Sequence, residues 1–134
     1  MTIDTPRAAA VAPKPPLIVV VDDDDGVREV CAYGLRDAGY TVEAFGRGDD
    51  ALRAVAGLGV AVLVVDWRMP GLDGAEVTRR ARALMPGLGV LMITGNPGEA
   101  AAPARSAGVN RLLTKPFDVT ELISAVAALA AAAS

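Results

Sequence analysis

Five short apolar segments recur along the chain, and stretches with helical periodicity separate them. The clearest apolar segment is residues 60–65, which contains only Val, Leu and Ala and is followed by the carboxylate of Asp66. Such a run predicts a strand that is buried on both faces of a sheet. With the other runs, strands are expected at residues 17–21, 41–45, 60–65, 89–93 and 109–113.

Helical periodicity and capping residues predict a helix after each strand. The expected helices cover residues 25–38, 49–56, 74–84 and 98–107, and a last helix starts at Asp118 or Thr120. The fourth helix contains Pro103, so we expect it to be short or irregular. This alternation predicts an α/β fold, a five-stranded parallel sheet with helices on both faces. For five doubly wound strands we expect the flavodoxin-like order 2-1-3-4-5.

This strand order would bring several polar side chains to one edge of the sheet. Asp22 and Asp23 follow the first strand, Asp66 the third, Thr94 the fourth and Lys115 the fifth. Open α/β sheets bind their ligands at this carboxyl edge. Three carboxylates in one crevice repel each other, and a hard cation such as Mg²⁺ relieves that repulsion. Asp66 could then attack phosphorus, while Thr94 and Lys115 donate to the phosphoryl oxygens.

Composition excludes several kinds of function. The sequence has no histidine, so it has no imidazole metal site, no Ser-His-Asp triad and no phosphohistidine of its own. A net charge of −3 argues against nucleic acid binding as the main task. No apolar run is long enough to cross a bilayer, and residues 1–16 lack the apolar core of a secretory signal, so a cytoplasmic location is expected. The single cysteine, Cys31, is expected to pack in the core.

Four short motifs give the chain a resemblance to a known family. They are Val-Val-Asp-Asp-Asp at 20–24, Asp-Trp-Arg-Met-Pro-Gly-Leu-Asp-Gly at 66–74, Ile-Thr-Gly at 93–95 and Lys-Pro-Phe at 115–117. In this order they resemble the receiver domain of two-component response regulators. The resemblance implies that Asp66 accepts a phosphoryl group from a sensor histidine kinase or a histidine phosphotransfer protein. It also implies that phosphorylation changes binding to a downstream partner.

The resemblance further implies a metal site. Asp23, Asp66 and the backbone carbonyl of Arg68 would ligate Mg²⁺, or Mn²⁺ in its place, and Asp22 would act through water. Such a domain is not an enzyme with a separate substrate, but a phosphoacceptor with self-catalysed phosphorylation and slow autodephosphorylation. Direct binding to nucleic acid or to a membrane is not expected.

An output switch is also implied, and here the sequence departs from the family pattern. Thr94 and Lys115 would bind the phosphoryl oxygens, and Thr94 would couple to an aromatic residue three positions before the lysine. That position is Leu112 in this chain. The segment between Thr94 and Lys115, with Pro97 and Pro103, is also about one residue shorter than is usual for the family. We therefore expect a weakened or rerouted switch beside an intact phosphorylation site.

Two other functions remain as alternatives. Asp23-Asp24-Asp25-Gly26-Val27 after a strand also resembles the first motif of haloacid-dehalogenase-type phosphatases, with Asp23 as nucleophile and Asp25 as acid/base. That family needs a later acidic pair, for which only Asp118 and Glu121 remain, and the Asp66 motif would be unexplained. The other alternative is a degenerate receiver that serves only as a docking module.

The sequence divides into three parts. Residues 1–16 are rich in Pro and Ala and predict a disordered arm, residues 17–131 form the expected receiver domain, and residues 132–134 form a short tail. The chain would be a single-domain regulator, a relay, or the receiver part of a larger protein.

Overall fold

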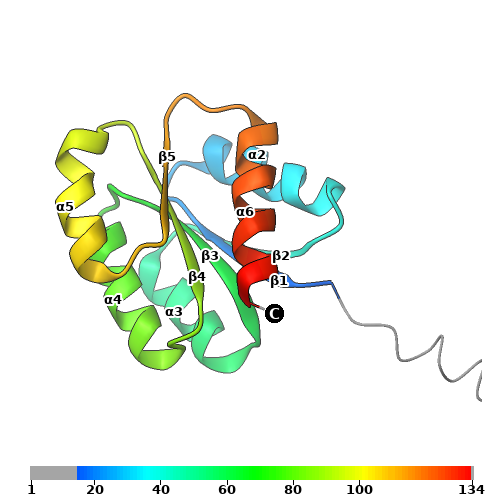
Figure 1. Cartoon of the computed structure of the whole chain (residues 1–134), viewed down its shortest axis with the longest axis horizontal. Coiled ribbons are helices and arrows are strands. Elements are labelled where there is room, and N and C mark those ends of the chain that lie inside the picture. The colour runs from blue at the N-terminus through cyan, green and yellow to red at the C-terminus, as the bar shows by residue number, and fades with distance from the viewer. Residues whose placement is uncertain (1–14, 134) are drawn as a thin grey trace, which may run out of the picture.

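A parallel five-stranded sheet forms the centre of the molecule. The computed structural model describes residues 15–133, and Figure 1 shows the sheet between two sets of helices. The strand order is β2-β1-β3-β4-β5, which confirms the predicted fold class and the order 2-1-3-4-5. The strands are β1 (Leu17–Val21), β2 (Thr41–Phe45), β3 (Val60–Asp66), β4 (Gly89–Thr94) and β5 (Arg111–Thr114).

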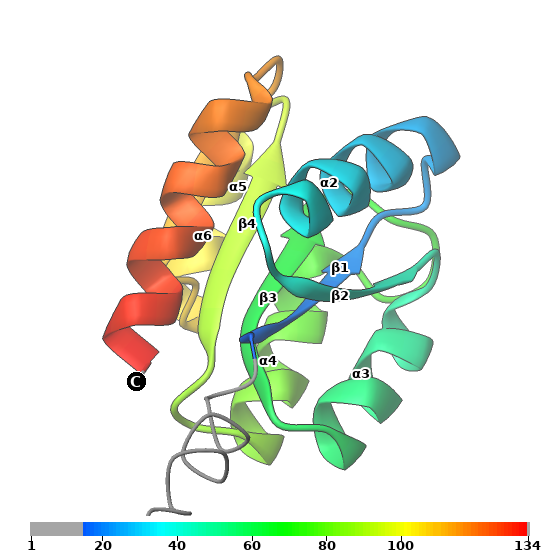
Figure 2. The same cartoon turned by 90° about the vertical axis from the view of Figure 1, so that its right-hand side faces the viewer.

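Helices cover both faces of this sheet. One face carries α3 (Gly48–Gly57), α4 (Gly74–Leu84) and α5 (Pro97–Ala107), and the other carries α2 (Asp25–Asp37) and α6 (Val119–Ala133) (Figure 1, Figure 2). The central strands β1, β3 and β4 lie between the two layers, so nearly all their side chains are buried. Alternate residues of a strand point to opposite faces, which divides the core into two clusters.

The prediction that Cys31 packs in the core is confirmed. It lies on α2 and is 1% exposed, packed in the cluster between the sheet and helices α2 and α6. Burial raises the pKa of its thiol to about 11, so the thiol stays protonated at neutral pH. Its role is therefore packing.

The fifth strand starts later than the sequence pattern predicts. It begins at Arg111, because the residues before it complete the end of α5. Gly108 adopts a left-handed conformation with φ of 93°, and the N–H of Val109 then donates to the carbonyl of Ala104. Glycine adopts this conformation without strain, so the cap closes the helix before the strand can start.

The expectation that the fourth helix is short or irregular is wrong. α5 runs without a break from Pro97 to Ala107 and includes Pro103 in its interior. Pro103 removes only one backbone N–H donor from the helix. The Asn96 side chain caps the start, Gly108 caps the end, and three alanines pack their inner face into the core. These contacts keep the helix intact despite the proline.

The described residues extend a little beyond the first strand and reach the end of the last helix. Pro15 and Pro16 precede β1, and the Pro16 carbonyl accepts a hydrogen bond from the N–H of Thr41 at 3.3 Å. At the other end, α6 extends to Ala133, within the predicted tail. The rest of the predicted arm, residues 1–14, lies outside the described residues, as does residue 134. Within the described range, every helix is too short or too polar to cross a membrane.

Candidate functional site

Asp66 ends β3 at the carboxyl edge of the sheet and is only 5% exposed. The Nζ atom of Lys115 lies 2.8 Å from its Oδ1 atom. Burial raises the pKa of Asp66, while the hydrogen bond and the charge of Lys115 act in the opposite direction. The backbone N–H of Arg68 also binds this carboxylate and lowers its pKa. A buried carboxylate with a single cationic partner is typical of functional sites.

Asp22 follows β1 and is 3% exposed. Its Oδ1 accepts a hydrogen bond from the N–H of Asp24 at 2.9 Å, whereas its buried Oδ2 has no hydrogen-bond partner among residues 15–133. Burial is the main cause that raises the pKa of Asp22 to about 6, and the nearby charge of Asp66 adds to it. A buried carboxylate oxygen without a partner costs free energy of folding, so a cation or a water molecule bound to this atom would stabilise the protein.

The carboxylates of Asp22, Asp23 and Asp66 converge at this edge. One oxygen of each lies within 4.8 Å of the others. Carboxylate and water oxygens are the preferred ligands of Mg²⁺, and the unpartnered Oδ2 of Asp22 is an atom that a hydrated cation would satisfy. The three residues therefore fit a hard divalent cation.

The next two acidic residues, Asp24 and Asp25, form contacts outside this cluster. Asp24 caps α2 by accepting from the N–H of Val27 at 3.0 Å. Asp25 is exposed, and its Oδ1 lies 2.5 Å from a guanidinium nitrogen of Arg28. A haloacid-dehalogenase-type mechanism needs Asp25 as its acid/base, and this exposed ion pair does not suit that role.

Thr94 and Lys115 come from adjacent strands and line the same small cavity. Thr94 is 1% exposed, and its Oγ1 accepts a hydrogen bond from the N–H of Asn96 at 2.9 Å. The N–H of Lys115 donates to the carbonyl of Thr94 at 2.8 Å, so the end of β5 is fixed to the end of β4. Burial alone would lower the pKa of the Lys115 ammonium. The hydrogen bond to Asp66 and the negative charge of Asp66 have the larger, opposite effect, so the pKa of Lys115 is raised. Lys115 thus stays charged.

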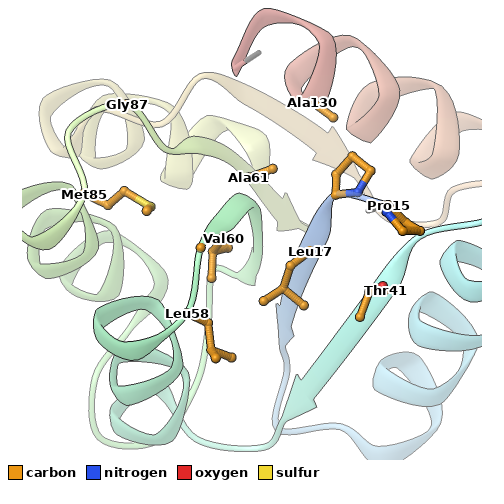
Figure 3. Close-up of a pocket in the computed structure, with 11 residues that line it drawn as sticks. Pro15, Leu17, Thr41, Leu58, Val60, Ala61, Met85, Gly87 and Ala130 are labelled. Carbon is orange, nitrogen blue, oxygen red and sulfur yellow. The ribbon is translucent and has the colours of Figure 1, made fainter. Parts of the chain in front are cut away.

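The cavity beside Asp66 has a volume of about 170 Å³. Its walls come from the ends of β3, β4 and β5 and the start of α5; the lining residues are Asp66, Trp67, Arg68, Thr94, Gly95, Asn96, Glu99 and Lys115. A larger groove of about 820 Å³ lies at the opposite, amino edge of the sheet (Figure 3). It is lined by residues such as Pro15, Leu58 and Met85, and none of the predicted site residues reaches it.

The loop after Asp66 is folded tightly against the acceptor. Gly74 begins α4, and a Cβ atom there would lie 2.5 Å from the backbone carbonyl oxygen of Asp66. Only glycine permits this approach. The preceding Asp73 caps α4 by accepting from the N–H of Glu76 at 2.9 Å. The start of α4 is therefore held directly against the end of β3.

One contact in the site was not predicted from the sequence. The carboxylate of Glu99, in the first turn of α5, accepts a hydrogen bond from Trp67 Nε1 at 2.8 Å and forms an ion pair with Arg68. These bonds hold the pKa of Glu99 below its usual range, and Trp67 contributes most. The only sequence signal for this contact was that Trp67, a hydrogen-bond donor, and Arg68, a cation, directly follow Asp66.

Leu112 lies in the middle of β5 and is partly buried against the core on the α3–α5 face. It pairs in register with Met92 of β4. Its side chain is smaller than an aromatic ring and carries no hydroxyl. The structure thus places an aliphatic residue where the resemblance leads one to expect a switch residue.

Comparisons with known proteins agree on one family. The family model described as response regulator receiver domain matches residues 18–127. The chain is 36% identical over 101 residues to the DNA-binding transcriptional regulator NtrC of Salmonella typhimurium, which covers 75% of this chain and 22% of that protein. It is 40% identical over 104 residues to the response regulator MprA of Mycobacterium ulcerans, which covers 77% of this chain and 45% of MprA. The chain thus spans less than half the length of these relatives.

A solved structure shares the whole architecture. The crystal structure of a putative response regulator from Chloroflexus aurantiacus superposes with a TM-score of 0.82 at 36% sequence identity, and the match covers 88% of this chain and 99% of that one. The family match leaves the haloacid-dehalogenase alternative without support. With its strand order, its acidic cluster and its matched range, the chain belongs to the response regulator receiver family, which acts as the phosphoacceptor in two-component signalling.

Proposed function

We propose that Asp66 is the phosphoacceptor of this receiver domain, and that its donor is the phosphohistidine of a sensor kinase or a histidine phosphotransfer protein. The observation that carries this proposal is the buried Asp66 carboxylate, bound to Lys115 and within 4.8 Å of Asp22 and Asp23. Residues 1–134 contain no histidine, so the phosphohistidine donor lies outside this sequence.

The proposed transfer uses atoms already in place. A carboxylate oxygen of Asp66 attacks phosphorus, the bond between phosphorus and the donor nitrogen breaks, and the donor imidazole keeps that electron pair. The Lys115 ammonium, 2.8 Å from Asp66, moves to a phosphoryl oxygen and neutralises its charge. The Thr94 hydroxyl donates to a second phosphoryl oxygen, since its hydrogen is not needed for its bond with Asn96.

A divalent cation completes the proposal. Asp23, Asp66 and the carbonyl of Arg68 would ligate Mg²⁺ or Mn²⁺, and Asp22 would bind through water. Bound there, the cation would offset the charge on the phosphoryl oxygens. The convergence of three carboxylates and the unpartnered Oδ2 of Asp22 support this assignment.

The domain would signal by phosphorylation-dependent binding to a protein partner in the cytoplasm. NtrC is by name a DNA-binding regulator, and the match covers only 22% of its length. We propose that residues 17–131 themselves bind neither nucleic acid nor membrane, because the chain has a net charge of −3.

Phosphorylation with a small donor tests the proposal. Incubation with acetyl phosphate and Mg²⁺ should add one phosphoryl group, seen by intact-mass spectrometry. Asp66→Asn should abolish the addition, and excess chelator should suppress it. Asp37→Asn, which changes an exposed carboxylate at the end of α2, should leave it unchanged. Labelling that persists in Asp66→Asn would refute the assignment of the acceptor.

A further inference from the structure

The Glu99 carboxylate joins two segments that meet at the mouth of the acceptor cavity. It binds Trp67 Nε1 at 2.8 Å and pairs with the guanidinium of Arg68, both on the loop directly after Asp66. All three residues line the cavity of about 170 Å³ that also contains Asp66, Thr94 and Lys115. This three-residue contact, which we call the clasp, therefore ties the start of α5 to the acceptor loop.

The side chain of Glu99 is available for this role because it is not used to cap its own helix. At the third position of a helix, Glu often bonds back to the N–H of the capping residue. Here that N–H, of Asn96, donates to Thr94 Oγ1 at 2.9 Å, while Asn96 Oδ1 accepts from the N–H of Glu99. The cap is complete without the carboxylate of Glu99, which turns across the cavity instead.

The charges that line the cavity are paired in the unphosphorylated state. Lys115 pairs with Asp66, and Arg68 pairs with Glu99. A phosphoryl group on Asp66 would bring up to about two negative charges into this cavity. These charges would repel the Glu99 carboxylate and attract Arg68, which binds phosphate oxygens well.

The clasp is weak enough to open. The Arg68 side chain is 73% exposed, and exposed ion pairs contribute little because water screens them. An added dianion at Asp66 can therefore outcompete Glu99 for Arg68. Loss of Arg68 leaves Glu99 held only by Trp67 and repelled by the phosphoryl group.

We propose that Glu99 is a positioning residue that ties α5 to the acceptor loop until Asp66 is phosphorylated, and that Arg68 then leaves Glu99 for the phosphoryl oxygens. This inference rests on the proposed role of Asp66. It assigns the first step of signal output to the start of α5, where the chain has charged groups. Leu112 on β5 offers no aromatic ring for that step.

Beryllofluoride, which mimics an aspartyl phosphoryl group, tests the clasp. Trp67 is the only tryptophan, so its fluorescence reports both the clasp and the occupied site. The midpoint of a beryllofluoride titration in Mg²⁺ should fall by up to about fivefold in Glu99→Ala, the most that an exposed ion pair contributes. Glu29→Ala, which removes an exposed carboxylate of α2 that does not line the cavity, should match the parent.

The same change in an Arg68→Ala background separates a positioning role from a merely structural one. If Glu99 acts through Arg68, Glu99→Ala should shift the midpoint by a smaller factor once Arg68 is absent, because only the direct repulsion of Glu99 remains. An equal shift in both backgrounds, or none in either, would overturn the clasp while leaving Asp66 as acceptor. A parent protein that neither binds beryllofluoride nor gains a phosphoryl group would instead refute the proposed function itself.

Discussion

The two edges of the sheet are formed by the same strands and bury very different groups. At the carboxyl edge, Asp22, Asp66 and Thr94 are almost completely buried, and the last two line a cavity of about 170 Å³. At the amino edge, a groove of about 820 Å³ is lined by Pro, Leu, Val, Met, Ala and Gly, with Thr41 as its one polar side chain among the described residues. The larger groove thus has no charged side chain in its lining, whereas the smaller cavity is lined by the buried Asp66 carboxylate and its partner Lys115. Buried charge, rather than volume, therefore singles out the carboxyl edge as the candidate functional site.

Helix direction explains much of this difference. Each of the five described helices follows a parallel strand and therefore starts at the carboxyl edge. Three of them, α2, α4 and α5, are capped there by the side chains of Asp24, Asp73 and Asn96. Helix N-termini carry partial positive charge, which favours an anionic group such as a phosphoryl oxygen. At the amino edge, Arg82 near the end of α4 donates to the backbone carbonyls of Pro86 and Gly108. The carboxyl edge therefore offers helix N-termini to an anion, whereas at the amino edge the guanidinium of Arg82 is bound by the protein's own backbone carbonyls.

The largest expected effect comes from Gly74→Ala. Its Cβ would lie 2.5 Å from the Asp66 carbonyl oxygen and 3.1 Å from the Cα of Trp67, and both are backbone atoms that cannot move alone. We expect a loss of about 2–3 kcal/mol in the free energy of unfolding. Displacement of the acceptor should also slow phosphorylation by about tenfold or more. Denaturant unfolding and intact-mass kinetics measure the two effects.

Gly87→Ala is the matched change at the amino edge. A Cβ at Gly87 would meet no atom within 4 Å, so stability should change by less than about 1 kcal/mol. Phosphorylation kinetics should equal those of the parent. Similar losses in the two variants would show that the carboxyl edge is not the more tightly constrained one.

A smaller effect is expected from the buried charge of Asp22. Its folded pKa of about 6 lies above the ordinary value of 3.8, so its charge lowers stability above pH 6, and this penalty disappears as the pH falls toward 4. Without metal, Asp22→Asn should stabilise the protein by about 2 kcal/mol at pH 7.5 and by about half as much at pH 5. Thermal melts in chelator at the two pH values measure this.

Asp23→Asn is the comparison for that experiment, because Asp23 belongs to the same cluster but is exposed. Its stabilisation should be smaller than that of Asp22→Asn. Millimolar Mg²⁺ should raise the melting temperature of the parent more than that of either variant, since a ligand of the folded state stabilises by mass action. A less stable Asp22→Asn protein at pH 7.5 would contradict the unpaired buried charge.

The smallest effect on the site is expected from Leu112→Ala. Truncation of a partly buried leucine should lower the free energy of unfolding by about 1–2 kcal/mol. The fluorescence response of Trp67 to beryllofluoride should nevertheless stay close to that of the parent, since we assign the output to the start of α5. Loss of that response in a folded Leu112→Ala protein would show that the leucine does the work of the usual aromatic residue.

Much of the fold could be predicted from the sequence because the signals were local and consistent. The apolar run at 60–65 favours a central strand. Because the strands are parallel, the polar residues that follow them are then expected to lie at the same edge of the sheet. The strand order and the convergence of Asp22, Asp23 and Asp66 both agree with that prediction. The alternation of predicted strands and helices was therefore sufficient to place the candidate site at one edge of the sheet.

The remaining details depend on contacts that leave little trace in a sequence. Pro103 has an unfavourable local propensity, but the caps at Asn96 and Gly108 and the packed alanines of α5 outweigh it. The start of β5 depends on how Gly108 ends the preceding helix. The clasp depends on the side-chain direction of Glu99, which is free only because Asn96 bonds to Thr94. Each case is decided by how capping, packing and side-chain direction combine, rather than by one local pattern.

Chemical trapping of the acceptor tests the central claim most directly. Borohydride reduces an aspartyl phosphate to homoserine, so the residue that carried the phosphoryl group can be identified by peptide mass spectrometry after reaction with acetyl phosphate and Mg²⁺. Reduction at Asp66 alone is the predicted result, because this carboxylate is buried beside Lys115 and Thr94 at the carboxyl edge of the sheet. Reduction at Asp23 instead, as a phosphatase of the haloacid-dehalogenase type would require, would contradict it.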